Sequence, residues 1–217
     1  MPVMIANPIS EAQWLSLGVS RESLTRLEVL VRVAAKWQEH INLIAPSTLP
    51  EIWNRHVLDS AQLLPLLPRN TAKIADLGSG GGFPGLVLAA TQSAEIHMFE
   101  ANAKKVAFLQ EALRKMGVSA NVHRERLQQN QAPPNMPDVQ VVTARAFAPL
   151  TQLLGYAAPF MAKGAIGLFH KGQDIDTELM AAAKAWHITA QKHSSLTDSR
   201  SVILEVKEIA HVYGQSK

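Results

Sequence analysis

The chain has 217 residues, of which 47% are hydrophobic and 18% are charged. This composition is typical of a globular protein and excludes a disordered chain, a collagen-like chain and a disulfide scaffold. The 21 Lys and Arg residues against 18 Asp and Glu residues give a formal net charge of only +3, a slight indication of a polyanionic partner.

The chain contains no cysteine, which excludes thiolate metal sites and thiol nucleophiles. Its first residues lack a basic start followed by an apolar run, and no stretch of about 18 uncharged apolar residues occurs. The eight histidines show no pairing at metal-ligand spacing. We therefore expect a soluble cytoplasmic protein without a membrane span and without a metal.

The first seventy residues are predicted to be helical. Between Ser20 and Asn42, apolar residues recur every three or four positions, which indicates an amphipathic helix. A second helix is expected to begin near Pro50 and to end before Pro65. Residues 1–70 are thus predicted to form a helical extension packed on the domain formed by residues 71–217, with one structural unit overall.

Residues 71–217 alternate between short apolar runs and helical stretches, which predicts an α/β fold. About seven strands are expected, in a mainly parallel sheet covered on both faces. A helix is expected between Pro149 and Met161. The strand candidates are KIADLG, EIHMFE, VSANVHR, DVQVVTARA, AIGLFHK and SVILEV.

A glycine-rich segment, DLGSGGGFPG from Asp76 to Gly85, lies where a buried strand ends and a helix begins. Glycines there let the backbone approach a ligand, and the helix N-terminus offers free N–H groups. Glu100 closes the next strand, 24 positions after Asp76, where a carboxylate can bind both ribose hydroxyls. Asp76, Gly80, Gly82 and Glu100 are therefore predicted to form a site for an adenosine cofactor. The residues alone leave open whether it is a dinucleotide.

The chain resembles the class I S-adenosylmethionine-dependent methyltransferases, and within them the 16S ribosomal RNA guanine-N7 methyltransferases, also called glucose-inhibited division protein B. The segments that carry this resemblance cover nearly the whole chain and keep the family's order: NLI, RHVLDS, the GFPG turn, KKVAFL, RAFAPL and HKGQ. It implies a Rossmann-like, seven-stranded sheet with an N-terminal helical extension. It also implies methylation of N7 of one guanine in 16S ribosomal RNA, with S-adenosylmethionine as cofactor and the RNA or the small ribosomal subunit as partner. We expect the protein to act as a monomer.

The resemblance also implies roles for individual residues. Gly78 and Phe83 should line the cofactor loop, while Leu127 and Gln128 should lie beside the adenine. The position of Gln128 is often acidic in the family, so its backbone is the expected contact. Arg145 should lie near the methionyl end of the cofactor and face the RNA.

Four further residues are candidates for RNA contact. The resemblance points to Lys171 and Arg200, which lie at strand ends. Arg55 and His56 lie within one helical turn of Asp59, and this cluster has two interpretations. It either joins the extension to the sheet domain or reaches the RNA or the cofactor.

The chemistry of N7 methylation agrees with the residues present. Guanine N7 attacks with a lone pair that carries no proton, so no general base is needed, and positioning should supply most of the acceleration. We assign Arg145 an orienting role in catalysis. Two alternatives remain at this stage: an NAD-dependent Rossmann oxidoreductase, which leaves the RHVLDS and RAFAPL segments unexplained, and a non-catalytic RNA-binding protein, which leaves the cofactor loop unexplained.

Overall fold

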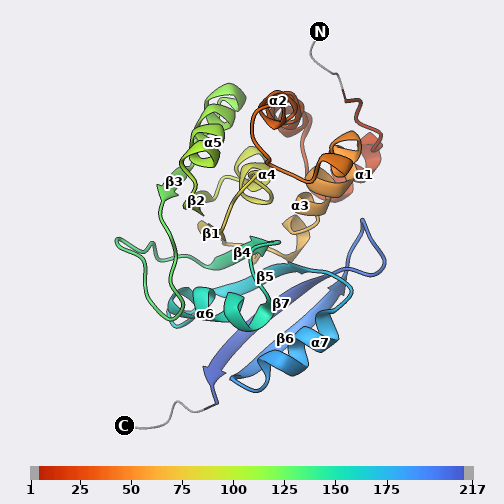
Figure 1. Ribbon diagram of the computed structural model, residues 1–217. Coiled ribbons are helices and arrows are strands. Elements are labelled where there is room, and N and C mark those ends of the chain that lie inside the picture. The colour runs from red at the N-terminus through yellow and green to blue at the C-terminus, as the bar shows by residue number, and fades with distance from the viewer. Residues whose placement is uncertain (1–4, 213–217) are drawn as a thin grey trace.

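The computed structural model describes residues 5–212, which form one seven-stranded sheet with the order β3-β2-β1-β4-β5-β7-β6 (Figure 1). All neighbouring strands pair in parallel except β7, which is antiparallel to both β5 and β6. The strands are β1 (Lys73–Leu77), β2 (Glu95–Glu100), β3 (Asn121–Arg124), β4 (Val141–Arg145), β5 (Ile166–Lys171), β6 (Trp186–Ser194) and β7 (Val202–His211).

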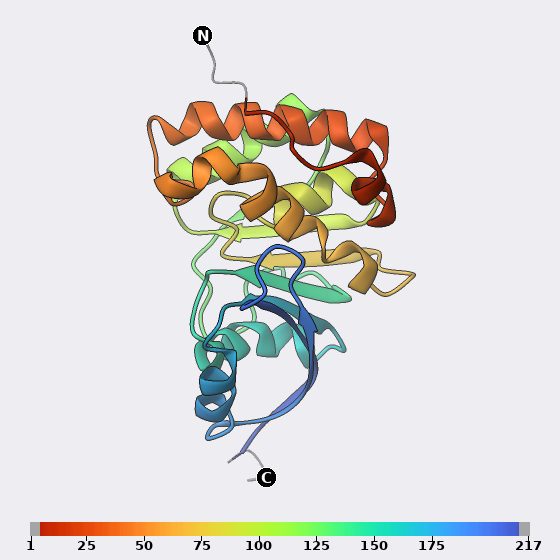
Figure 2. The same ribbon diagram turned by 90° about the vertical axis from the view of Figure 1, so that its right-hand side faces the viewer.

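Helices cover both faces of the sheet, as Figures 1 and 2 show. The helices α4 (Gly85–Thr91) and α5 (Ala103–Met116) pack on one face together with the N-terminal segment. The other face packs against α6 (Leu150–Met161) and α7 (Ile175–Ala182). Successive strand residues point to opposite faces, so Ile74 belongs to the first apolar core and Ala75 to the second.

The segment before β1 is helical, as predicted, but it is less regular than expected. It contains α1 (Glu11–Ser16) and α2 (Arg21–Gln38), where Ser20 caps the predicted amphipathic helix. The expected second helix is a succession of a 3₁₀ turn, η1 (Pro46–Glu51), a π-helical turn, η2 (Trp53–Leu58), α3 (Asp59–Ala61) and a last 3₁₀ turn, η3 (Leu64–Leu66). Its apolar residues share one core with α4 and α5.

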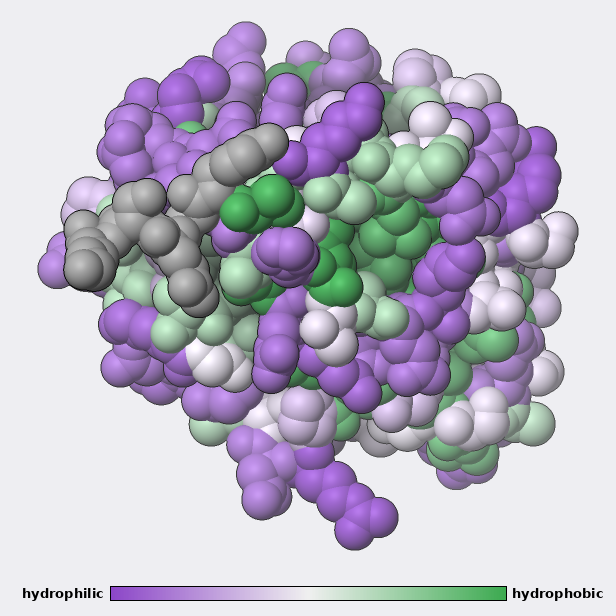
Figure 3. Space-filling model, turned by 90° about the horizontal axis from the view of Figure 1, so that it is seen from below, coloured by the Kyte–Doolittle hydropathy of each residue, from purple (hydrophilic) through white to green (hydrophobic). Residues whose placement is uncertain are grey.

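The predicted α/β fold class is confirmed, whereas two elements were missing from the sequence-based prediction. Strand β6 is an edge strand whose residues are mostly exposed, so it lacks the continuous apolar run of a buried strand. Helix α7 was also not predicted; only Ile175 and Ala182 of its eight residues are buried. Both lie near the underside of the molecule, where apolar surface is gathered among hydrophilic residues (Figure 3).

None of the helices within residues 5–212 is long and apolar enough to span a membrane.

Candidate functional site

A cavity of about 1290 Å³ opens at the carboxyl ends of β1, β2 and β4, where the glycine segment leaves β1. This is the point at which the strand order reverses, the usual place of a ligand in an open α/β sheet. Gly78 has a φ of +66°, and a Cβ there would lie 2.1 Å from the ring of Phe147. Only glycine fits at position 78, and Gly78, Gly80 and Gly81 present backbone without side chains to the cavity.

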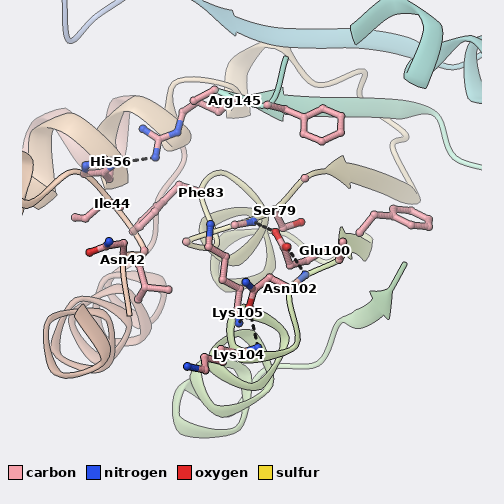
Figure 4. A pocket seen from close by; sticks show the side chains of 18 of the residues that line it. Asn42, Ile44, His56, Ser79, Phe83, Glu100, Asn102, Lys104, Lys105 and Arg145 are labelled. Atoms are coloured by element: carbon pink, nitrogen blue, oxygen red, sulfur yellow. Dashed lines mark hydrogen bonds between the residues drawn. The ribbon is translucent and has the colours of Figure 1, made fainter. Parts of the chain in front are cut away.

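Glu100 stands at the end of β2 on the wall of this cavity. Its Oε2 accepts the Gly80 N–H at 2.9 Å and its Oε1 accepts the Asn102 N–H at 2.7 Å. A carboxylate has about four acceptor positions, so lone pairs remain for two hydroxyl groups of a ligand. Figure 4 shows Glu100 and Asn102 on one side of the pocket and Asn42 and Ile44 on the other.

Arg145 ends β4 and lies where the N-terminal helical segment meets the sheet. Its Nη1 donates to the carbonyl oxygen of Arg55 at 3.0 Å and lies 3.3 Å from Oδ2 of Asp59. Its Nη2 lies 2.6 Å from Nδ1 of His56, and its Cζ is 5.4 Å from the centroid of the Phe83 ring. Burial lowers the pKa of the guanidinium, and the Asp59 carboxylate opposes that shift.

The π-helical turn η2 explains how Arg145 reaches a backbone carbonyl. In η2 the N–H of Asp59 donates to Asn54, five residues back, instead of to Arg55. The carbonyl of Arg55 is thereby directed to the guanidinium of Arg145. Such turns often occur at functional sites.

The structure places His56 inside this arrangement, not on an open surface. Its side chain is buried, and its ring lies 5.2 Å from that of Phe83. Burial, reinforced by the charge of Arg145, lowers the pKa of His56 to about 3, so the imidazole is neutral at pH 7. His56 and Arg145 both line the cavity, as Figure 4 shows.

Most of the predicted cofactor residues lie around this cavity. Its lining includes Gly78, Gly80, Phe83, Leu127 and the residues described above.

Three predicted cofactor residues do not line the cavity. Asp76 is 1% exposed and points beneath the loop, where it accepts the hydroxyl of Thr143 at 2.8 Å, and its burial raises its pKa to about 6. Gly82 begins to turn the chain into α4, and Gln128 is exposed. Asp76 therefore supports the loop from below, and a direct contact with a ligand in the cavity does not fit its position.

A second cavity, of about 410 Å³, shares Arg145, His56 and Thr48 with the first. At its rim, the carboxylate of Asp198 bridges Arg55, at 3.5 Å, and Arg200, at 3.3 Å. The structure thus brings together these two predicted RNA contacts.

Lys171 also lines the second cavity, but its side chain is only 7% exposed. Its Nζ lies 2.6 Å from Oε2 of Glu178, which also accepts the N–H of Leu150 at the start of α6. This ion pair ties β5 to α6 and α7. The predicted RNA contact of Lys171 does not fit this placement, because the ammonium group is already engaged inside the protein.

Sequence reasoning missed a segment that covers the cavity, residues 42–48, which we call the strap. The side chain of Gln38 holds it, accepting the N–H of Leu43 at 2.9 Å and donating to the carbonyl of Ile44 at 2.9 Å. The carbonyl of Leu43 lies 2.6 Å from where a Cβ on Gly81 would stand, so the strap rests directly on the glycine loop. The NLI segment, residues 42–44, belongs to the family resemblance, but nothing in its sequence indicated that it contacts the glycine loop.

The described residues contain no group of three or more His, Asp or Glu side chains that could hold a metal ion. An adenosine cofactor fits the residues present: backbone from three glycines, free acceptor positions on Glu100 and a cavity larger than most ligand sites, with room for such a molecule.

Comparison with known proteins agrees with this geometry. Residues 23–206 match the family model GidB, described as rRNA small subunit methyltransferase G. The chain belongs to this family. It is 46% identical over 193 residues to the ribosomal RNA small subunit methyltransferase G of Paramagnetospirillum magneticum, an alignment that covers 89% of this chain and 92% of the relative. It is 48% identical to the protein of the same name from Rhodospirillum rubrum, with 92% and 97% covered. The family resemblance of the sequence is therefore confirmed.

Solved structures of low sequence identity share the fold of this family member. A SAM-dependent methyltransferase from Aquifex aeolicus is 16% identical, with a TM-score of 0.53, and the match covers 81% of this chain and 98% of the other. The O-methyltransferase TomG from Streptomyces achromogenes, solved in complex with SAM, is 14% identical, with a TM-score of 0.53 and coverage of 91% and 95%. The class I methyltransferase fold is confirmed.

Proposed function

We propose that the protein transfers a methyl group from S-adenosylmethionine to N7 of one guanine in the 16S RNA of the small ribosomal subunit. The observation that carries this proposal is the cavity at the ends of β1, β2 and β4, bounded by the glycine loop, Glu100 and Arg145, in a chain of this family. The small subunit or its RNA is the proposed partner, and the proposed setting is the cytoplasm.

The residues of the large cavity suit the parts of the cofactor. Glu100 is placed to accept the ribose hydroxyls, and Leu127 lies on the wall for the adenine. The bare backbone from Gly78 to Gly81 admits the chain that joins ribose to sulfur. Bound S-adenosylmethionine supplies an electrophilic methyl group on a sulfonium ion.

The catalytic contribution of the protein is positioning. No side chain has to remove a proton, since N7 carries none, and a correctly oriented pair of reactants can gain on the order of 7–11 kcal/mol. The guanidinium of Arg145 is fixed by Arg55, Asp59 and His56 at the edge shared by the two cavities. We assign it the orientation of the guanine through O6 or a phosphate, because a cation aimed at the ring would oppose the positive charge that develops there.

Basic side chains stand where an RNA would approach. Lys104, Lys105 and Arg126 line the large cavity. Arg55 lines the second cavity, and Arg200 is held beside it through Asp198. These cations are suited to phosphate contacts, which carry most of the affinity for RNA and make it depend on salt.

The segment before β1 has a part in this proposal. We assign residues 1–70 to an extension that completes the cofactor cavity through the strap and residues 71–217 to the methyltransferase domain, the two forming one unit that acts as a monomer. The comparisons favour neither a nicotinamide-dependent oxidoreductase nor a non-catalytic RNA-binding protein.

The test is transfer of labelled methyl from S-adenosylmethionine to purified small subunits, protein-free 16S RNA and unrelated RNA, followed by borohydride and aniline cleavage at N7-methylguanine. Label and cleavage at one guanine of the ribosomal substrates is the expected result. Titration with S-adenosylhomocysteine and with NADH runs beside it, and only the former should bind. Absence of label on every RNA despite binding of S-adenosylhomocysteine would overturn the RNA substrate.

A further inference from the structure

A chain of hydrogen bonds runs from the end of β4 to the strap over the cofactor cavity. Nη2 of Arg145 lies 2.6 Å from Nδ1 of His56, and Nε2 of the same ring lies 2.7 Å from Oγ1 of Thr48. The Thr48 hydroxyl in turn donates to the carbonyl of Ala45 at 2.8 Å. Arg145 is thus linked without a gap to the strap, which lies far earlier in the sequence, before β1.

The direction of every bond follows from counting protons. The guanidinium of Arg145 has only donors, so Nδ1 of His56 is bare and accepts from it. A neutral imidazole carries one N–H, which is then on Nε2 and donates to Oγ1 of Thr48. The Thr48 hydroxyl proton is left for the carbonyl of Ala45, which also accepts the backbone N–H of Thr48 at 2.9 Å.

The opposite tautomer would break the chain at Arg145. With the proton on Nδ1, the ring would point an N–H at the N–H groups of Arg145, and the Thr48 hydroxyl would have to turn from the carbonyl of Ala45 to the bare Nε2. The charged groups that face His56 are Arg145, Asp59 and Arg55, and the low pKa of the ring agrees with a neutral imidazole.

We propose that Thr48 and His56 are positioning residues for Arg145. Arg145 requires a bare Nδ1 on His56, and the Thr48 hydroxyl, as acceptor of the Nε2–H, holds the ring in the orientation that presents Nδ1 to the guanidinium. The position of the strap over the cofactor cavity is thereby linked to the group that orients the guanine. The proposal rests on the proposed methyl transfer for its catalytic consequence, whereas the tautomer is a property of the protein alone.

Two substitutions of one residue separate the hydrogen bond from the shape of the side chain. Thr48→Val keeps the shape and removes the hydroxyl, and Thr48→Ser keeps the hydroxyl. Thr48 is half-buried, so both variants should fold. We expect kcat for methyl transfer to small subunits to fall at least tenfold in Thr48→Val, while the affinity for S-adenosylhomocysteine changes less than threefold, and Thr48→Ser should restore kcat.

Thr71→Val is the matched control. The hydroxyl of Thr71 also donates to a carbonyl three residues back, that of Pro68, at 2.8 Å, but it lies outside both cavities. This variant loses the same kind of local bond and should retain kcat. An equal loss in Thr71→Val, or equal kcat in Thr48→Val and Thr48→Ser, would overturn the positioning role.

The tautomer is read separately by ¹⁵N NMR of the full chain labelled at histidine, with the His56 signals assigned by their loss in His56→Gln. We expect a protonated Nε2 and a bare Nδ1 in the wild type, in Thr48→Ser and in Thr48→Val, with a changed Nε2 shift in Thr48→Val alone, where this N–H has lost its acceptor. A protonated Nδ1 in the wild type would overturn the proposal even if no RNA were methylated. The expected tautomer in a protein that methylates no RNA would instead contradict only the proposed function.

Discussion

At the scale of single residues, two glycines have nearly the same backbone conformation and very different surroundings. Gly78 has a φ of +66° and Gly117 a φ of +67°, but only a Cβ on Gly78 would meet another group, the ring of Phe147. We expect Gly117→Ala to lose roughly 1 kcal/mol of unfolding free energy from the left-handed backbone alone, and Gly78→Ala to lose more, because its Cβ must also displace the ring of Phe147. Only Gly78→Ala should lose affinity for S-adenosylhomocysteine, by about tenfold or more, in calorimetric titration. Equal affinities in the two variants would contradict the place of Gly78 in the cofactor loop.

Turnover should depend on whether residue 145 carries a guanidinium or an ammonium group. The planar guanidinium of Arg145 contacts Arg55, Asp59 and His56 at the same time through hydrogen bonds. An ammonium group cannot reproduce that geometry. We therefore expect Arg145→Lys to reduce turnover on small subunits by about 10- to 100-fold, although the charge is kept. Arg32→Lys, on the exposed side of α2, is the control and should leave turnover unchanged. Full turnover in Arg145→Lys would show that charge alone suffices.

At the scale of elements, the strap depends on one side chain of α2. Gln38 makes three hydrogen bonds to its backbone, two as acceptor and one as donor. We expect Gln38→Leu to speed amide hydrogen exchange at Leu43 and Ile44 and to weaken binding of S-adenosylhomocysteine several-fold. Gln110→Leu, at an exposed position of α5, should change neither. Unchanged exchange in Gln38→Leu would mean that packing on the glycine loop alone holds the strap.

Local patterns predicted the elements that bury a continuous apolar run, and they failed where a contact is long-range. The turn in the DLGSGGGFPG segment could be predicted from the sequence, because its positive φ values require glycine. The π-helical turn at Arg55 and His56 could not be predicted, because its displaced carbonyl is explained only by Arg145, 90 residues away. Lys171 was predicted to contact RNA because of the family resemblance and its place at a strand end. No nearby residue in the sequence indicates that it pairs with Glu178.

At the scale of the whole molecule, buried histidines make stability depend on pH. Burial lowers the pKa of His56, His97, His123 and His170, so the folded chain keeps them neutral where the unfolded chain binds protons. The free energy of unfolding should therefore fall as the pH drops below about 6.5, by about 2 kcal/mol at pH 5 for His56 alone.

Asp76 contributes with the opposite sign: because burial raises its pKa to about 6, the folded protein takes up a proton there first, and the free energy of unfolding rises as the pH falls from about 6 to about 4. Urea unfolding from pH 5 to 8 measures the sum, in which we expect the four histidines to outweigh one aspartate. His187→Gln, at an exposed position, should keep the slope. Stability that rises as the solution is acidified would contradict the neutral state of these rings.

The charge at the cavity rim is tested by ionic strength. Binding to 16S RNA should weaken steeply with added salt if Arg55 and Arg200 contact phosphates. Each of Arg55→Gln and Arg200→Gln should then reduce the slope of log K against log salt by about 1, whereas Arg32→Gln should not. Asp198→Asn should strengthen binding, since its carboxylate competes with phosphate for both arginines. Equal slopes in all variants would remove these arginines from the RNA interface.

The loop between β6 and β7 contacts residues 59–62, which precede β1. The Leu196 N–H donates to the side chain of Gln62, and the Thr197 hydroxyl donates to Asp59. These bonds close loops of more than 130 residues, whose ordering entropy is lost before the contacts form. During synthesis, the α3 side of the second cavity therefore forms only after the β6–β7 hairpin has left the ribosome. The protein that we propose to modify ribosomes thus completes this site only after strands β1 to β5 have been translated.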